Sequence, residues 1–227
     1  MTSTTTPFSL KVEGNAEIPL PADRAIIKVL VESEGSNKAA VSDEALTAAK
    51  HLEKILREMS LSEACPLAHW SKTSLSATSH RPRNDEGQLQ PRQYNSSVSF
   101  DIRFKEFKAL GAFAGRISSV SNVEINHIEW VLTAETQALH RSRLRKMAAG
   151  DAMQIARDYC DALGCGSPRP VNLEVDSYGS RGNKYYMASQ ELPGVGGGGD
   201  DEGSVVIEFT PQEVKMDLIV EVTFHAE

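Results

Sequence analysis

The sequence predicts an α+β fold, a mostly antiparallel sheet with about three helices packed on one face. Three observations support this prediction. Segments in which apolar and polar residues alternate indicate strands, and segments with apolar residues at steps of three and four indicate helices. The predicted elements follow the order ββαββαβαββ, which is neither the strict alternation of a parallel α/β sheet nor an all-β pattern.

The first half of the chain contains the first helix and most of the early strands. A short strand over residues 8–14 is followed by an apolar strand over residues 25–32, whose side chains are apolar on both faces, as in a central strand. Residues 37–59 are predicted to form a helix, because their apolar residues form one stripe at helical period. Residues 69–78 form the next predicted strand, and the polar stretch 80–93 is expected to be a long hairpin loop.

The second half contains two more helices and the most regular strand. A long helix over residues 135–163 ends at Gly164, and alanines at steps of four on its buried side suggest close packing on a sheet. The strictest alternation in the chain lies at 214–224. The other predicted elements are strand 94–104, helix 105–117, strand 123–132 and strand 171–175.

The chain is expected to form a single domain over residues 1–227, with a flexible N-terminus at 1–6 and a Gly-rich insertion at about 177–211. Within that insertion Gly194, Gly196 and Gly199 match the dinucleotide-binding pattern G-x-G-x-x-G. A dinucleotide turn needs a strand before it and a helix N-terminus after it, whereas acidic residues follow here. The favoured interpretation is a flexible loop without a cofactor.

Composition limits the classes of partner. Hydrophobic residues make up 40% and charged residues 24% of the 227 positions, a balance that supports a buried core. The formal net charge of -7 argues against a general affinity for nucleic acid or anionic membranes. No stretch reaches the roughly 20 apolar residues of a membrane span. We therefore expect no nucleic-acid partner and no membrane span.

The cysteines and the N-terminal residues bear on localisation. Cys65, Cys160 and Cys165 form an odd set without a C-x-x-C motif, which favours reduced thiols. The first residues lack the basic and apolar regions of a signal peptide. The expected localisation is cytoplasmic. Cys165, directly after Gly164, is a candidate reactive thiol.

A run of basic residues on the long helix is the candidate interaction patch. It is either a docking site for an acidic partner or phosphate, or a solvated helix face that balances the acidic remainder of the chain. Its members are His140, Arg141, Arg143, Arg145 and Lys146.

Motifs of catalysis and metal binding are incomplete. His127 and Glu129 form the H-x-E of zinc deaminases, but the P-C-x-x-C that must follow is missing. The chain also lacks the G-x-S-x-G of a nucleophile elbow. We therefore predict no catalytic, cofactor or metal residues, and a non-enzymatic protein is favoured.

Five motifs in order resemble the SIMPL domain family, over residues 8–224 in all. Trp130 stands in the third motif where the family prefers Phe. The motifs are the strand ending at Gly14, the Pro-Ala-Asp at 21–23, the strand at 121–133, the helix at 148–164 with its Asp151-Ala152 pair, and the closing strand at 214–224.

The resemblance implies a limited set of functions. Bacterial members are mainly periplasmic, some form ring-like or channel-like homo-oligomers, and some are tied to oxidative-stress tolerance. A mammalian relative binds an interleukin-receptor-associated kinase and promotes inflammatory signalling. The resemblance implies no catalytic residues. The expected function is a non-enzymatic, homo-oligomerising interaction or scaffold module in stress response or signalling, with a possible protein partner. The alternative is a small-molecule-binding protein or enzyme with a pocket between helices and sheet.

Overall fold

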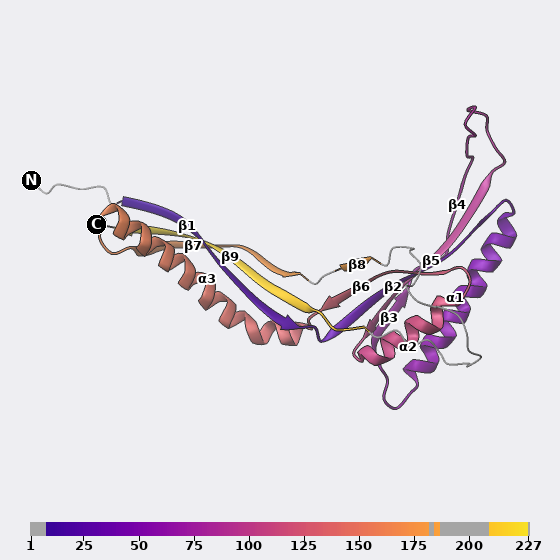
Figure 1. The fold of residues 1–227 in the computed structure, drawn as a ribbon, viewed down its shortest axis with the longest axis horizontal. Helices are drawn as coiled ribbons and strands as arrows, with labels where there is room; N and C mark the ends of the chain where they lie inside the picture. Colours follow the sequence, from indigo (N-terminus) through magenta and orange to yellow (C-terminus); the bar gives the residue numbers. More distant parts are fainter. Residues whose placement is uncertain (1–7, 182–183, 187–208, 227) are drawn as a thin grey trace, which may run out of the picture. The chain divides into compact units, whose positions relative to one another are not determined.

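The computed structural model describes residues 8–181, 184–186 and 209–226. It confirms the α+β class with antiparallel sheets (Figure 1). The chain forms two compact units. The terminal unit comprises the described residues within 1–22, 131–183 and 212–227, and the central unit comprises those within 23–130 and 184–211.

The terminal unit is a three-stranded sheet in the order β1-β9-β7. β1 (Phe8–Pro21) and β9 (Glu213–Ala226) pair antiparallel along their whole length without a register shift. β7 (Arg169–Arg181) pairs antiparallel with the other edge of β9. The perfect alternation of β9 has a structural reason, because every second side chain from Val214 to Ala226 is buried.

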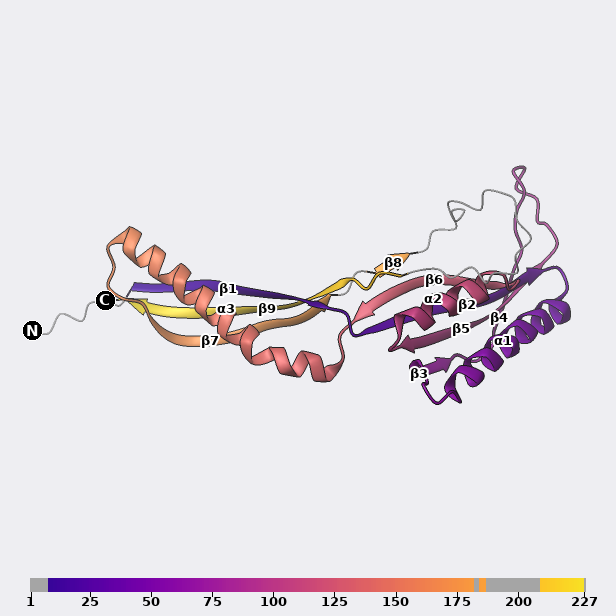
Figure 2. The same cartoon turned by 60° about the horizontal axis from the view of Figure 1, so that its bottom comes forward.

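One helix, α3 (Ala134–Leu163), covers this sheet by contacting β1 and β9 (Figure 2). The Thr133 side chain caps its N-terminus by accepting the Thr136 N–H, and Gly164 ends it in the left-handed conformation with a φ of 69°. The small side chains on its buried side allow a close approach. The buried residues are Leu144, Ala148, Ala152, Ala156 and Cys160.

The central unit has a second sheet in the order β3-β5-β2-β6-β8, and β4 also pairs with β5. Two helices, α1 and α2, pack against it (Figure 1). The bounds of its elements are β2 (Arg24–Gly35), α1 (Lys38–Ser60), β3 (Leu67–Lys72), β4 (Ser76–His80), β5 (Gln93–Phe104), α2 (Phe107–Ser118), β6 (Val123–Val131) and β8 (Lys184–Tyr186).

Both helices of the central unit cover the same face of its sheet. On β5, Phe104 contacts the ring of Phe113 in α2, with the ring centroids 5.4 Å apart. Ser96, on the same face of β5, shares a hydrogen bond of 3.1 Å with Ser42 of α1. Apolar side chains of β2 and β5 fill the space beneath the helices, and Phe100, Ile102 and Phe104 are almost completely buried.

The structure differs from the sequence-based prediction in how the strands are grouped and where they end. The strands belong to two sheets instead of one. The strand expected at 69–78 is divided into β3 and β4, and between them Thr73 donates its N–H to the Ser99 carbonyl and accepts the Ser99 N–H with its side chain. β7 is longer than the predicted 171–175, because β9 pairs with it as far as Arg181. Residues 177–181 and 184–186, expected within the Gly-rich insertion, are therefore strand.

Gly14 sets the distance between α3 and the sheet. A Cβ atom at this position would lie 2.6 Å from the Ala152 backbone nitrogen and 2.7 Å from the Ala152 Cβ. Such distances are far below van der Waals contact, so the helix would have to move. We expect Gly14→Ala to lower the free energy of unfolding by about 1–3 kcal/mol, as measured by urea denaturation.

The control substitution is Gly150→Ala on the exposed side of α3. A Cβ there has no heavy atom within 4 Å. Because alanine favours a helix over glycine, this variant should gain about 0.5–1 kcal/mol of stability. A Gly14→Ala protein that unfolds at the same urea concentration as the wild type would contradict the close approach.

In the central unit, Glu53 of α1 joins the helix to β3. Lys72 and Arg57 both donate hydrogen bonds to its carboxylate, and these bonds lower its pKa below the usual value. A lowered folded-state pKa stabilises the fold above the pKa of the unfolded chain, and the gain is lost as the pH falls through the folded-state pKa. We expect Glu53→Gln to lower the melting temperature at neutral pH and to have little effect in strong acid.

Glu58→Gln is the matched control, because Glu58 is half exposed and its ion pair with Arg116 spans 3.7 Å. Exposed pairs of this kind contribute little to stability. A Glu53→Gln variant with the same melting temperature as the wild type at neutral pH would show that the Glu53 contacts do not stabilise the unit.

Candidate interaction surface

The outer strand of the terminal sheet, β7, has apolar side chains that α3 does not cover. Leu173 pairs with Val222 and Val175 pairs with Val220 of β9, so both point to the same face as these two valines. Val220 also pairs with Gly14, which lies directly beneath α3. Leu173 and Val175 therefore lie on the helix-covered face of the sheet, yet they are 50% and 48% exposed.

Val171 extends this apolar strip, and it is 53% exposed. A shift of register lies between Pro170 and Asn172, and a second lies between Val175 and Ser177. The regular part of β7 is thus the short segment 172–175. We call Val171, Leu173 and Val175 together with the outer backbone of this segment the β7 edge.

The backbone at the β7 edge is directed outward at alternate residues. On β1, the Asn15 N–H donates to Asp151 Oδ2 of α3 at 2.8 Å, so this N–H points away from β9. Asn15 pairs with Ile219, and the alternation of an antiparallel ladder then directs Ile219, Glu221 and Thr223 of β9 towards β7. Glu174 pairs with Glu221 and Asn172 pairs with Thr223, so these two β7 residues direct their backbone N–H and C=O groups towards β9. Leu173 and Val175 consequently direct their N–H and C=O groups away from the sheet.

The opposite edge of the sheet, on β1, is protected against strand pairing. The Asp151 carboxylate accepts a hydrogen bond from the outward N–H of Asn15. By the same alternation Pro19 and Pro21 stand at outward positions, and proline has no N–H to donate. Prolines and charged side chains are common protections of edge strands. On β7 the outward backbone groups between the two register shifts belong to the aliphatic residues Leu173 and Val175, and Glu174 is the one charged residue of this segment.

The other face of the terminal sheet is polar. Lys11 of β1 and Glu221 of β9 form an ion pair of 2.7 Å, and Lys215 and Glu17 form one of 2.8 Å. On β7 the Asn172 side-chain amide donates to the Glu174 carboxylate at 3.0 Å. The sheet therefore has one solvated face and one apolar face, and the apolar face is incompletely covered.

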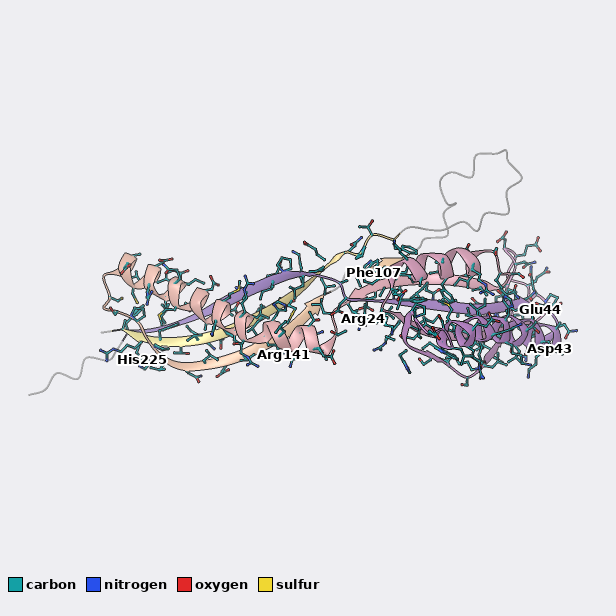
Figure 3. All side chains as sticks on the ribbon, turned by 90° about the horizontal axis from the view of Figure 1, so that it is seen from below. Arg24, Asp43, Glu44, Phe107, Arg141 and His225 are labelled. Carbon is teal, nitrogen blue, oxygen red and sulfur yellow. The ribbon has the colours of Figure 1, made fainter. Side chains whose placement is uncertain are left out.

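The basic residues of the candidate patch all lie on α3, but they surround the helix axis. Arg141 and Arg145 are four residues apart and share one flank, whereas Arg143 lies about 200° around the helix from Arg141 (Figure 3 labels Arg141). His140 is half-buried, and the exposed members include Lys146. Their role in partner binding stays a prediction.

The two cysteines at the end of α3 are neighbours. The Cys165 N–H donates to the Cys160 carbonyl at 2.9 Å across the Gly164 cap. Cys160 is buried, and burial together with the nearby Cys165 thiol raises the pKa of Cys160. Cys165 is only partly buried.

An open cavity of about 490 Å³ lies in the central unit beside α1. Its lining includes Asp43, Glu44 and His51 of α1 and the turn residue Asn122 (Figure 3 labels Asp43 and Glu44). The Glu44 carboxylate accepts a hydrogen bond of 2.6 Å from the Ser33 hydroxyl. Within the described residues, groups of three or more side chains able to hold a metal ion are not found.

Two sequence-based predictions fall on other parts of the chain. The pattern Gly194, Gly196, Gly199 lies outside the described residues. His127 and Glu129 lie on β6, where they pair with β8. None of the helices in the described part of the chain has the length and apolarity needed to cross a membrane.

Sequence reasoning did not identify the β7 edge. The sequence correctly indicated a strand at 171–175. Alternation shows that a face is apolar but not whether a helix of the same chain reaches it.

The fold defines a class of protein built from two antiparallel sheets with three helices packed on them, and no catalytic constellation is found among the described residues. The sequence matches the family described as SIMPL, protein of unknown function (DUF541), over residues 10–224. The chain belongs to this family. A comparison with curated proteins finds no significant match.

The different burial of the two neighbouring thiols leads to a test of Cys165. A thiol reacts as the thiolate, so a buried thiol with a raised pKa reacts slowly. We expect iodoacetamide to modify Cys165 in the native protein well before Cys160, as followed by peptide mass spectrometry. Cys160 should react only after denaturation. Equal rates at the two thiols, or an unreactive Cys165, would contradict this order.

Proposed function

We propose that the protein is a non-enzymatic interaction module that acts by assembling with further copies of itself. The observation that carries the proposal is the β7 edge, where half-exposed aliphatic side chains lie beside outward backbone groups. Exposed edges of this kind pair readily with other strands, and most proteins protect them. The protected β1 edge of the same sheet makes the open β7 edge more distinctive.

The surface charges favour a partner that is not nucleic acid or an anionic membrane. The chain has 31 acidic and 24 basic residues, and the basic residues of α3 are spread around the helix. An assembled module would present its remaining surfaces as a scaffold for a protein partner. A role in stress response or signalling and a cytoplasmic location belong to the same proposal, and they rest on the family resemblance and on the expectation of reduced thiols.

The second candidate function is small-molecule binding, which the cavity beside α1 favours. Carboxylates of Asp43 and Glu44 suit a cationic or hydrogen-bond-donating ligand. A ligand that binds only the folded protein must raise its melting temperature. A thermal-shift screen with amines, nucleotides and metal ions would support this candidate if Asp43→Asn abolished a shift, and would oppose it if all compounds left the melting temperature unchanged.

Light scattering at increasing concentration tests the assembly. We expect the average mass of the wild type to rise from that of a monomer as the concentration increases from micromolar to submillimolar. Leu173→Lys should keep the protein monomeric, because it places a charge in the centre of the β7 edge.

Leu139→Lys is the matched control, since Leu139 is 76% exposed on α3 of the same unit. It should assemble like the wild type. A wild type that stays monomeric at every concentration would contradict the proposed function. Equal effects of the two substitutions would show that the β7 edge has no special part in assembly.

A further inference from the structure

We propose that two copies of the chain pair antiparallel through their β7 strands, with Leu173 of one copy directly opposite Leu173 of the other. This inference rests on the proposed function, because it specifies the surface and the register of the self-association. It commits to a second copy as the occupant of the β7 edge.

Backbone geometry limits the registers that are possible. Two antiparallel strands exchange hydrogen bonds only between residues whose N–H and C=O groups point towards each other. On the regular part of β7 these residues are Leu173 and Val175, as derived from the Asn15–Asp151 bond and the pairing of β9. A two-fold axis through segment 172–175 can then pass at Asn172, Leu173, Glu174 or Val175.

Side-chain charge selects among these registers. An axis at Glu174 would place the two Glu174 carboxylates directly opposite each other, which is unfavourable. An axis at Asn172 would pair the two amides and leave Glu174 opposite Pro170, and an axis at Val175 would place Leu173 opposite Ser177. The axis at Leu173 places each Asn172 opposite Glu174 of the other copy, so an amide donor meets a carboxylate acceptor twice. The Asn172–Glu174 hydrogen bond within one strand shows that these side chains are compatible partners.

The same register brings the apolar side chains together on the other face. Leu173 meets Leu173, and Val175 of each copy lies near Val171 of the other, at the register shift where the regular segment ends. All of them are about half exposed in the single chain. Pairing would shield three aliphatic side chains from each copy, and aliphatic cross-strand neighbours stabilise antiparallel pairs. In this register the β7 edge is self-complementary on both faces of the sheet.

The geometry also limits the number of copies. A two-fold pairing uses the same edge on both chains, and such an isologous contact is closed. In each copy, the other edge of the terminal sheet lies on β1, where Asp151, Pro19 and Pro21 protect it. Pairing through β7 therefore ends at a dimer and does not continue into a fibre. Because the regular segment is short, the contact belongs to the small interfaces, which are weak.

Cysteine cross-linking distinguishes the registers. Asn172 and Glu174 of opposing copies would form a non-hydrogen-bonded pair with Cα atoms about 4.5 Å apart, within the range of a disulfide. The experiment uses the full chain as Asn172→Cys and Glu174→Cys, each alone and as a mixture in which one variant carries nitrogen-15. Mild oxidation is followed by mass spectrometry of the cross-linked peptides, which separates these products from those of the native cysteines.

The expected result is a cross-link between the two variants in the mixture. It should be at least tenfold more abundant than the self-cross-link that either variant forms alone. Abundant cross-linking of Glu174→Cys with itself would place the axis at Glu174, and self-cross-linking of Asn172→Cys would place it at Asn172. Either outcome overturns the proposed register. Adding Leu173→Lys to both variants should remove the mixed cross-link.

Light scattering and cross-linking together distinguish a wrong β7 pairing from a wrong proposed function. If the wild type gains mass in light scattering but the mixture gives no cross-link, the copies meet at another surface and the β7 pairing is wrong. If the wild type stays monomeric and no cross-link forms, both are wrong.

Discussion

The terminal unit depends on the pairing of the first strand with the last. β1 and β9 keep one register from Phe8 opposite Ala226 to Pro21 opposite Glu213, and this long ladder is the surface on which α3 and β7 both pack. Without β9, β1 would have no strand partner among the described residues, and β7 would lose its only described neighbour in the sheet. The apolar side of the ladder determines where the helix lies, and its polar side, with the ion pairs of Lys11 and Lys215, stays in solvent.

The open β7 edge follows from simple dimensions. A helix with its side chains is about 10 Å wide, and neighbouring strands are about 4.8 Å apart, so one helix covers about two strands. Gly14 and the alanines of α3 fix the helix over β1 and β9, which leaves the third strand uncovered. The central unit has two helices for its sheet, and Phe100, Ile102 and Phe104 of β5 are almost completely buried. In both units the strands that lie beneath a helix are therefore the ones with buried side chains.

Much of this arrangement could be predicted from the sequence, and the remainder depends on contacts between distant residues. Alternation identified β9, and the stepwise alanines identified the buried side of α3, because both patterns are local. The division into two sheets was not predictable, since alternation identifies an apolar face but not the strand that pairs beside it. The exposure of Leu173 depends on where α3 lies, and that depends on Gly14, a residue far away in the sequence. The greater exposure of Cys165 than of Cys160 follows from local pattern, because Cys160 lies on the buried side of α3 and Cys165 lies just beyond its end.

The pairing of β1 with β9 also has a consequence for the order in which the chain folds during synthesis. Most of the central unit lies within residues 23–130, whereas β9 begins only at Glu213. On the ribosome, β1 must therefore wait for almost the whole chain before its partner emerges, and closing so long a loop is entropically costly and slow. During that interval the apolar side of β1 has only α3 to cover it. The terminal unit is thus completed last, and one side of β1 lacks its strand partner until β9 is released.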